Sequence, residues 1–215
     1  MSHVATIAVH ITDLMALQFA CEVLGLEFVE GQTTFRWYGT HIGDYPLPEG
    51  FTKEDMGRCD HAIRLPNRPN AYEVGVVRRR DGKPGFTLMV DFWMGGFGLE
   101  ERIGTEARLL KQQYAAQIAL RQVRKQGFRV TQTLTQSGAI HLQCSRSTAA
   151  NPLEQIGLTI DPHALVQIEV KGHAGPGCQG LTEQIEKALG ERIEDTTTHE
   201  FHQPARTVLH TEYRA

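Results

Sequence analysis

The chain has 215 residues, of which 40% are hydrophobic and 22% are charged, and its formal net charge is −3. This composition can fill the core of one large domain or two small ones, and it gives no global case for binding nucleic acid or an anionic membrane. No basic and then apolar leader opens the sequence, and no apolar run approaches the roughly 18 residues that span a bilayer. We therefore expect a cytoplasmic protein with no membrane partner.

The first part of the chain predicts a strand, a helix and further strands. Residues 3–11 alternate between apolar and small or polar residues, which is typical of a strand. Asp13 can cap the helix that follows, and Gly25 can end it. One or two strands are expected within 26–38. The glycine- and proline-rich stretch 39–58 then predicts a long surface loop or site loop.

The middle of the chain predicts antiparallel strands and one long helix. The expected strands are 61–65, 72–80 and 86–93. Asp81-Gly82-Lys83-Pro84-Gly85 separates the last two strands and is a hairpin signal. Residues 94–98 break the strand, and apolar residues at helical spacing predict a helix at about 101–126.

The last part of the chain suggests a second module. Strands 128–136 and 139–146 form a hairpin, and the polar stretch 147–152 then predicts a linker between an α+β module, 1–146, and a small β-β-α module, 153–215. The expected elements of the second module are strands 156–160 and 165–170, a glycine loop, a helix at 181–189 that Gly190 caps, and a polar, His-rich tail. Adjacent strands joined by hairpins predict an antiparallel sheet with helices on one face, which is an α+β fold. For the first module we expect a ferredoxin-like or related split arrangement.

Two families resemble parts of this sequence. The opening Met-Ser-His, the segments YEVGVVRR and LMVDFW, and above all QQYAAQIALRQVRKQGFRV make residues 1–146 similar to a conserved hypothetical reading-frame family of plastid genomes and cyanobacteria. The segment GLTIDPHALVQIEVKGHAGPGCQGLTEQIEKALG resembles a second small family of unknown function. Members of both families are often encoded beside an AAA+ ATPase, so the resemblance implies that ATPase as a partner. It implies no catalytic residues.

The glycine loop before the last helix is a candidate contact site. Gly175, Gly177 and Gly180 spell G-x-G-x-x-G, which can present backbone amides to an anion, but the module has no second parallel strand of a dinucleotide-binding fold. Cys178 lies where a helix dipole can lower the pKa of a thiol, and a small buried thiol is the alternative. The candidate contacts for a partner or an anion are Gly175, Gly177 and Cys178 together with the basic hairpin residues Arg78, Arg79 and Arg80.

Histidine and cysteine residues give a second set of candidates. Cys59 and His61 lie at the edge of the long loop, and His199 and His202 lie three residues apart in the tail. Cysteine and histidine are the usual ligands of zinc. A connecting loop and exposed histidines explain the same residues, so we expect no cofactor, with zinc as the alternative.

No convincing catalytic set emerges, and the sequence favours a protein that is not an enzyme. Our leading hypothesis is a non-enzymatic accessory or adaptor protein that acts with an AAA+ ATPase. The second is a metal-binding or hydrolytic protein that uses cysteine and histidine residues. The third is a nucleic-acid-binding protein, in which the basic hairpin supplies cations and Trp37, Tyr38 and Trp93 supply stacking rings, although aromatic residues on strands are usually core.

Overall fold

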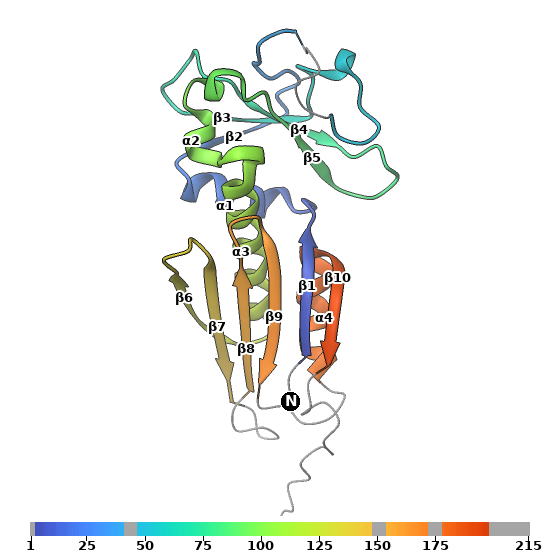
Figure 1. Ribbon diagram of the computed structural model, residues 1–215, viewed down its shortest axis with the longest axis vertical. Coiled ribbons are helices and arrows are strands. Elements are labelled where there is room, and N and C mark those ends of the chain that lie inside the picture. Colours follow the sequence, from blue (N-terminus) through green and yellow to red (C-terminus); the bar gives the residue numbers. More distant parts are fainter. Residues whose placement is uncertain (1–2, 41–46, 148–153, 172–177, 198–215) are drawn as a thin grey trace, which may run out of the picture.

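The computed structural model describes residues 3–40, 47–147, 154–171 and 178–197, which form two antiparallel sheets (Figure 1). The larger sheet has the strand order β10-β1-β9-β8-β7-β6. Its strands are β1 (His3–Val9), β6 (Arg129–Leu134), β7 (Ile140–Arg146), β8 (Glu154–Ile160), β9 (Leu165–Lys171) and β10 (Gly190–Thr197). The smaller sheet consists, in order, of β2 (Glu27–Glu30), β3 (His61–Arg64), β4 (Val74–Arg78) and β5 (Phe86–Met89).

Helices fill the space behind the larger sheet and connect it to the smaller one. They are α1 (Leu14–Val23), α2 (Leu99–Ile103), α3 (Arg108–Lys125) and α4 (Cys178–Leu189), with short 3-10 turns at Lys53–Asp55 and Thr105–Ala107. Helices α3 and α4 pack against each other on one face of the larger sheet, and α3 extends toward the smaller sheet (Figure 1). The expected α+β class is confirmed. None of the described helices is both long and apolar enough to cross a membrane.

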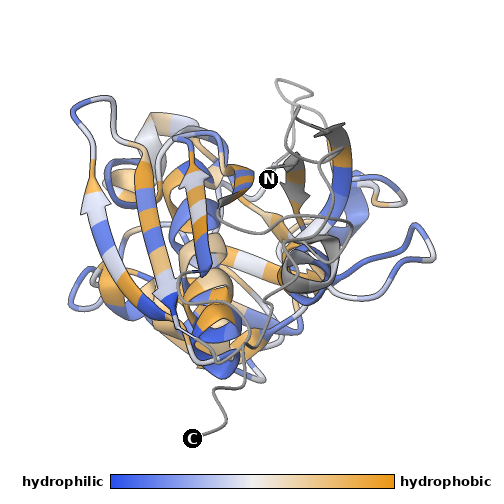
Figure 2. Cartoon of the chain, turned by 90° about the horizontal axis from the view of Figure 1, so that it is seen from below, coloured by the Kyte–Doolittle hydropathy of each residue, from blue (hydrophilic) through white to orange (hydrophobic). Residues whose placement is uncertain are grey.

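The larger sheet has one apolar face because its strands alternate with a period of two. In β8, Ile156, Leu158 and Ile160 are buried, while the residues between them are half-buried. Figure 2 shows hydrophobic and hydrophilic residues following one another along the strands. The apolar side chains face α3 and α4, so the core lies between the sheet and these two helices.

The larger sheet joins segments from both sides of the expected linker. Strand β7 pairs with β8 from Ile140–Ile160 to Arg146–Glu154, so residues 147–153 connect two strands of one hairpin. Strand β1 lies between β9 and β10, which α4 connects. The split arrangement is therefore formed by both ends of the chain and not within 1–146 alone. The division into 1–146 and 153–215 stays a prediction about which segments fold by themselves.

Two expectations about secondary structure are wrong. Residues 190–197 form β10 instead of a polar tail, because β1 offers them a pairing edge and an edge strand needs few apolar residues. The expected helix at 101–126 is interrupted after Ile103. Gly104 has a φ of +73°, and a side chain there would lie 2.7 Å from Cγ of Arg108. A glycine in this left-handed conformation ends one helix and allows the next to start in a new direction.

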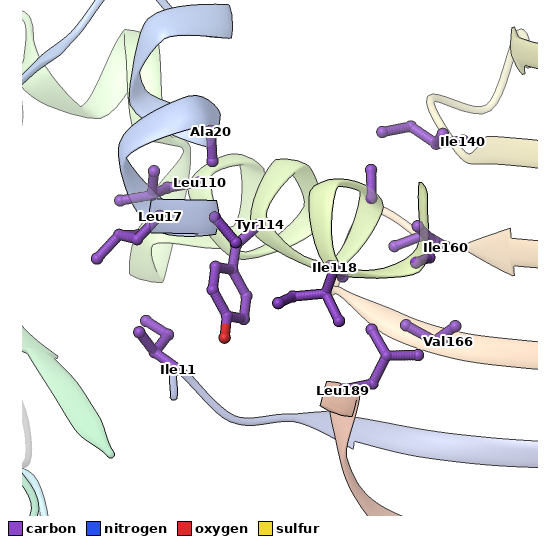
Figure 3. Close-up of a cluster of buried hydrophobic side chains, with 14 of the residues drawn as sticks. Ile11, Leu17, Ala20, Leu110, Tyr114, Ile118, Ile140, Ile160, Val166 and Leu189 are labelled. Carbon is purple, nitrogen blue, oxygen red and sulfur yellow. The ribbon is translucent and has the colours of Figure 1, made fainter. Parts of the chain in front are cut away.

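Tyr114 of α3 lies at the centre of the core (Figure 3). Its side chain is fully buried, and Figure 3 shows it between Leu17 of α1 and Ile11, just beyond β1. The hydroxyl oxygen accepts hydrogen bonds from the backbone N–H groups of Thr12, at 2.9 Å, and Asp13, at 3.2 Å. One side chain thus fixes the turn between β1 and α1 against the long helix.

Candidate functional site

Four large apolar side chains gather at the surface in segments that adjoin the smaller sheet. They are Tyr38, Trp93, Met94 and Phe97, with exposed fractions of 53, 44, 68 and 44% respectively. We call these four residues the aromatic surface. The ring centroids of Tyr38 and Trp93 lie 4.8 Å apart, and those of Trp93 and Phe97 lie 6.1 Å apart. The three rings therefore form one contiguous patch.

A single buried carboxylate holds the two segments of this surface together. Asp91 is only 3% exposed, and its Oδ2 accepts a hydrogen bond from the backbone N–H of Tyr38 at 3.0 Å. Its Oδ1 accepts another from the N–H of Trp93 at 2.8 Å. Because a buried carboxylate is costly without such partners, this arrangement fixes the backbone on which the two rings stand.

The other two members of the surface stand on a left-handed turn. Met94, Gly95, Gly96 and Phe97 all have φ between +53° and +63°. Glycine adopts this conformation freely, whereas each non-glycine residue in it costs about 1–2 kcal/mol. Tyr72 stabilises the turn, since its N–H donates to the carbonyl of Gly96 at 3.0 Å and its ring contacts Phe97 edge-on. Strained backbone of this kind gathers at functional sites.

A second apolar surface lies on α1. Met15, Phe19 and Val23 follow one another at intervals of four residues and are all exposed, so they share one face of the helix. The opposite face, with Ala16 and Leu17, is fully buried in the core. Gln18 and Glu22 are also exposed beside these residues, so the outer face of α1 carries an apolar stripe next to polar side chains.

Each arginine of the basic hairpin pairs with a carboxylate. The pairs are Arg78 with Asp60, Arg79 with Asp81, and Arg80 with Asp55. The two Arg80 bonds are 2.9 Å long, and the guanidinium also lies over the ring of Phe51.

These ion pairs reduce the positive charge that the basic hairpin presents to a partner. The arginines hold the pKa of both Asp55 and Asp81 at about 2, so the pairs persist across the physiological range. The hairpin charges are therefore largely compensated within the protein. That the arginines contact a partner stays a prediction.

The candidate zinc ligands Cys59 and His61 already have partners within the fold. The Sγ of Cys59 donates to the carbonyl of Gln32 at 3.0 Å, and burial raises the pKa of this thiol to about 11. The Nδ1 of His61 accepts from the N–H of Gly31 at 3.1 Å. Within the described ranges, no group of three or more His, Cys, Asp or Glu residues is placed to hold a metal ion.

Several candidates fall on parts of the chain about which the structure says little. Gly175, Gly177, His199 and His202 lie outside the described residues, and Cys178 is described only as the first residue of α4. Gly180 lies inside α4, so the third glycine of the G-x-G-x-x-G pattern belongs to the helix. The proposed roles of these residues stay predictions.

The aromatic candidates for nucleic acid separate into two groups. Trp37 packs half-buried in the small core beneath the 47–58 loop, whereas Tyr38 and Trp93 stack at the surface. The sequence reasoning missed Met94 and Phe97, because it interpreted MGGFG only as a break in a strand. The signal was present: two glycines between large apolar residues indicate a turn that can place both side chains at the surface.

Comparison with known proteins adds one family. Residues 156–202 match the family described as "Protein of unknown function (DUF2997)", a segment that includes most of β8 and all of β9, α4 and β10. No curated protein and no solved structure matches the chain. The matched segment overlaps the region whose hairpin, glycine loop and helix resemble a small family of unknown function.

Proposed function

We propose that this protein is a non-enzymatic accessory protein that binds a partner protein through its aromatic surface, and that the partner is an AAA+ ATPase. The observation that carries the proposal is the aromatic surface itself, in which Tyr38, Trp93, Met94 and Phe97 are large, apolar and about half-exposed or more. Contiguous apolar patches on a protein surface mark interaction sites.

The composition of the surface supports binding to a protein. Tryptophan, tyrosine, phenylalanine and methionine are enriched at protein interfaces, and buried aromatic anchors at the centre of an interface contribute about 2 kcal/mol or more each. The hydrogen bonds of Asp91 and the left-handed turn hold the side chains on a fixed backbone. Such preorganisation reduces the entropy that is lost on binding.

The chemistry of the described thiols supports a role other than nucleophilic catalysis. Burial raises the pKa of Cys21 to about 12, of Cys59 to about 11 and of Cys144 to about 12. A thiol with so high a pKa is almost entirely protonated at neutral pH and is a poor nucleophile. The choice of an AAA+ ATPase as partner rests on the resemblance of the sequence to families that are often encoded beside one.

The proposal is tested by affinity purification of the tagged protein from its host, with and without ATP, followed by a direct binding measurement with the recovered ATPase. Trp93→Ala should weaken binding by about 30-fold, the equivalent of 2 kcal/mol, because it removes the central ring of the surface. Leu134→Ala is the matched control, since Leu134 is a strongly exposed apolar residue on β6 with no place in the aromatic surface. Its affinity should equal that of the wild type.

Any of three outcomes would contradict the proposal. The first is that no ATPase is recovered. The second is that Trp93→Ala binds the ATPase as tightly as Leu134→Ala does, and the third is that the recovered partner is lost on nuclease treatment. The last result would favour the nucleic-acid hypothesis, in which the stacked rings of Tyr38 and Trp93 contact bases. Thermal unfolding of both variants shows whether a loss of binding comes from a loss of the fold.

A further inference from the structure

A cleft lies where the end of β1, the loop around Pro48, β5 and the start of α3 meet. It consists of two hollows, of about 270 Å³ and about 350 Å³. Both are lined by Pro48, Leu88 and Lys111, so they adjoin each other at these three residues. Small-molecule sites in proteins are concave, mostly apolar and have few polar groups, and the volumes of the two hollows lie just below and just above the lower end of their usual range.

The two hollows differ in chemistry. The walls of the smaller one carry polar groups, among them His10, Glu49, Arg79 and Asp81. Arg79 and Asp81 pair with each other, and burial, followed by the charge of Arg79, lowers the pKa of His10. The walls of the larger hollow are mainly apolar, formed by Leu47, Met56, Leu88, Met89, Val90 and Phe92, and Glu106 and Lys111 are the two charged residues that line it. The cleft is thus polar at one end and apolar at the other.

Lys111 stands at the junction of the two hollows. Its side chain comes from the first turn of α3 and is half-buried, and no carboxylate among the described residues lies within ion-pair distance of its amine. Glu106 acts on it only at longer range, and burial lowers the pKa of Lys111. An ammonium group that is partly removed from water without a carboxylate at ion-pair distance is unfavourable, and a bound anion would supply a counter-charge at close range.

The arginines near Lys111 already pair with carboxylates of the protein, and this limits the charge of the anion that can bind there. Arg79 pairs with Asp81, and Arg80 pairs with Asp55. Lys111 is therefore the one cation lining the two hollows with no carboxylate partner among the described residues. A lysine ammonium is a single point charge, so it balances a singly charged head group fully and a phosphate dianion only in part.

We propose that this cleft binds a small carboxylate with an apolar chain, whose carboxylate pairs with Lys111 and whose chain occupies the hollow formed by Leu47, Met56, Met89, Val90 and Phe92. This site is separate from the aromatic surface and does not depend on the partner proposed above. Its occupant is recognised by one charge and by its apolar chain.

Isothermal titration calorimetry of the full chain with three probes tests this site. Octanoate carries both features, octanol has the chain without the charge, and acetate has the charge without the chain. The wild type should bind octanoate saturably and at least tenfold more tightly than octanol, and it should bind acetate too weakly to measure. Lys111→Met removes the charge and keeps most of the length of the side chain, and it should weaken octanoate binding at least tenfold, while octanol binding changes less than twofold.

The controls separate this site from unspecific binding. Lys125→Met removes an exposed lysine at the far end of α3 and should leave octanoate binding unchanged. Lys111→Met should keep or raise the unfolding temperature, since it removes a half-buried charge. The proposal is overturned if octanoate does not bind saturably to the wild type, or if Lys111→Met and Lys125→Met bind it equally well.

Discussion

Replacing Gln112 by methionine should destabilise the whole chain. Gln112 lies on α3 and is only 2% exposed. Its Nε2 donates to the carbonyls of Gly138 at 2.9 Å, Ile160 at 3.1 Å and Asp161 at 3.0 Å. Gly138 belongs to the β6–β7 hairpin, and the other two carbonyls lie at the β8–β9 turn. One amide therefore connects the long helix to hairpins on both sides of the expected linker.

The size of the effect follows from the hydrogen-bonding capacity of the amide. The NH₂ group has two hydrogens, so three carbonyls share two donors. Each bond contributes about 0.5–1.5 kcal/mol net, and leaving a buried carbonyl unpaired adds about 1–3 kcal/mol. Because part of this region stays in contact with water, we expect Gln112→Met to lower the free energy of unfolding by about 2–4 kcal/mol. Methionine has nearly the same length, so the change in packing is small.

Urea unfolding, followed by circular dichroism, measures this loss. Gln113→Met is the matched control, because Gln113 is the next residue of α3, is half-buried and makes no hydrogen bond through its side chain to any described residue. It should change the free energy of unfolding by less than about 0.5 kcal/mol. Equal stabilities of the two variants would refute the role assigned to Gln112. Since β1 lies between β9 and β10, one unfolding transition is expected for each variant.

The elements that sequence analysis located correctly depend on residues close together in the chain. Asp13 caps α1 as expected, with its carboxylate accepting from the N–H of Ala16 at 2.9 Å. The turn at 81–85 likewise connects two paired strands, β4 and β5. Caps and hairpin turns are set by local conformation, so their residues are visible in the sequence.

The elements that were missed depend on contacts between distant residues. Strand β10 has the sequence GERIEDTT, which shows no apolar alternation, and it exists because β1 pairs with it across more than 180 positions of the chain. The break between α2 and α3 has a local cause. Gly104 indicates it in the sequence, but the apolar periodicity on both sides of this glycine predicted one continuous helix. Glycine inside a helix costs about 1 kcal/mol relative to alanine.

The candidate sites also depend on contacts between residues that are distant in the chain. Tyr38 and Trp93 were recognised as possible stacking residues, but only the fold, through Asp91, brings them together. The sequence did not indicate Lys111 as a site residue, because one lysine on a helix is normally a solvated residue. Its placement between two hollows depends on the loop around Pro48 and on β5.

Two further predictions concern single polar contacts. Tyr114→Phe should lower the free energy of unfolding by about 1–3 kcal/mol, because the N–H groups of Thr12 and Asp13 lose their acceptor. Urea unfolding measures this loss. Tyr72→Phe is the control and should lower the free energy of unfolding by less. The Asp55 carboxyl should titrate at about 2, below its ordinary 3.8, because of its hydrogen bonds to Arg80. The contribution of this pair to stability is then fully present above the unfolded pKa and is lost as the pH falls through about 2. In an NMR titration, Arg80→Gln should return the pKa of Asp55 toward 3.8, and an unchanged pKa would show that Arg80 is not the cause.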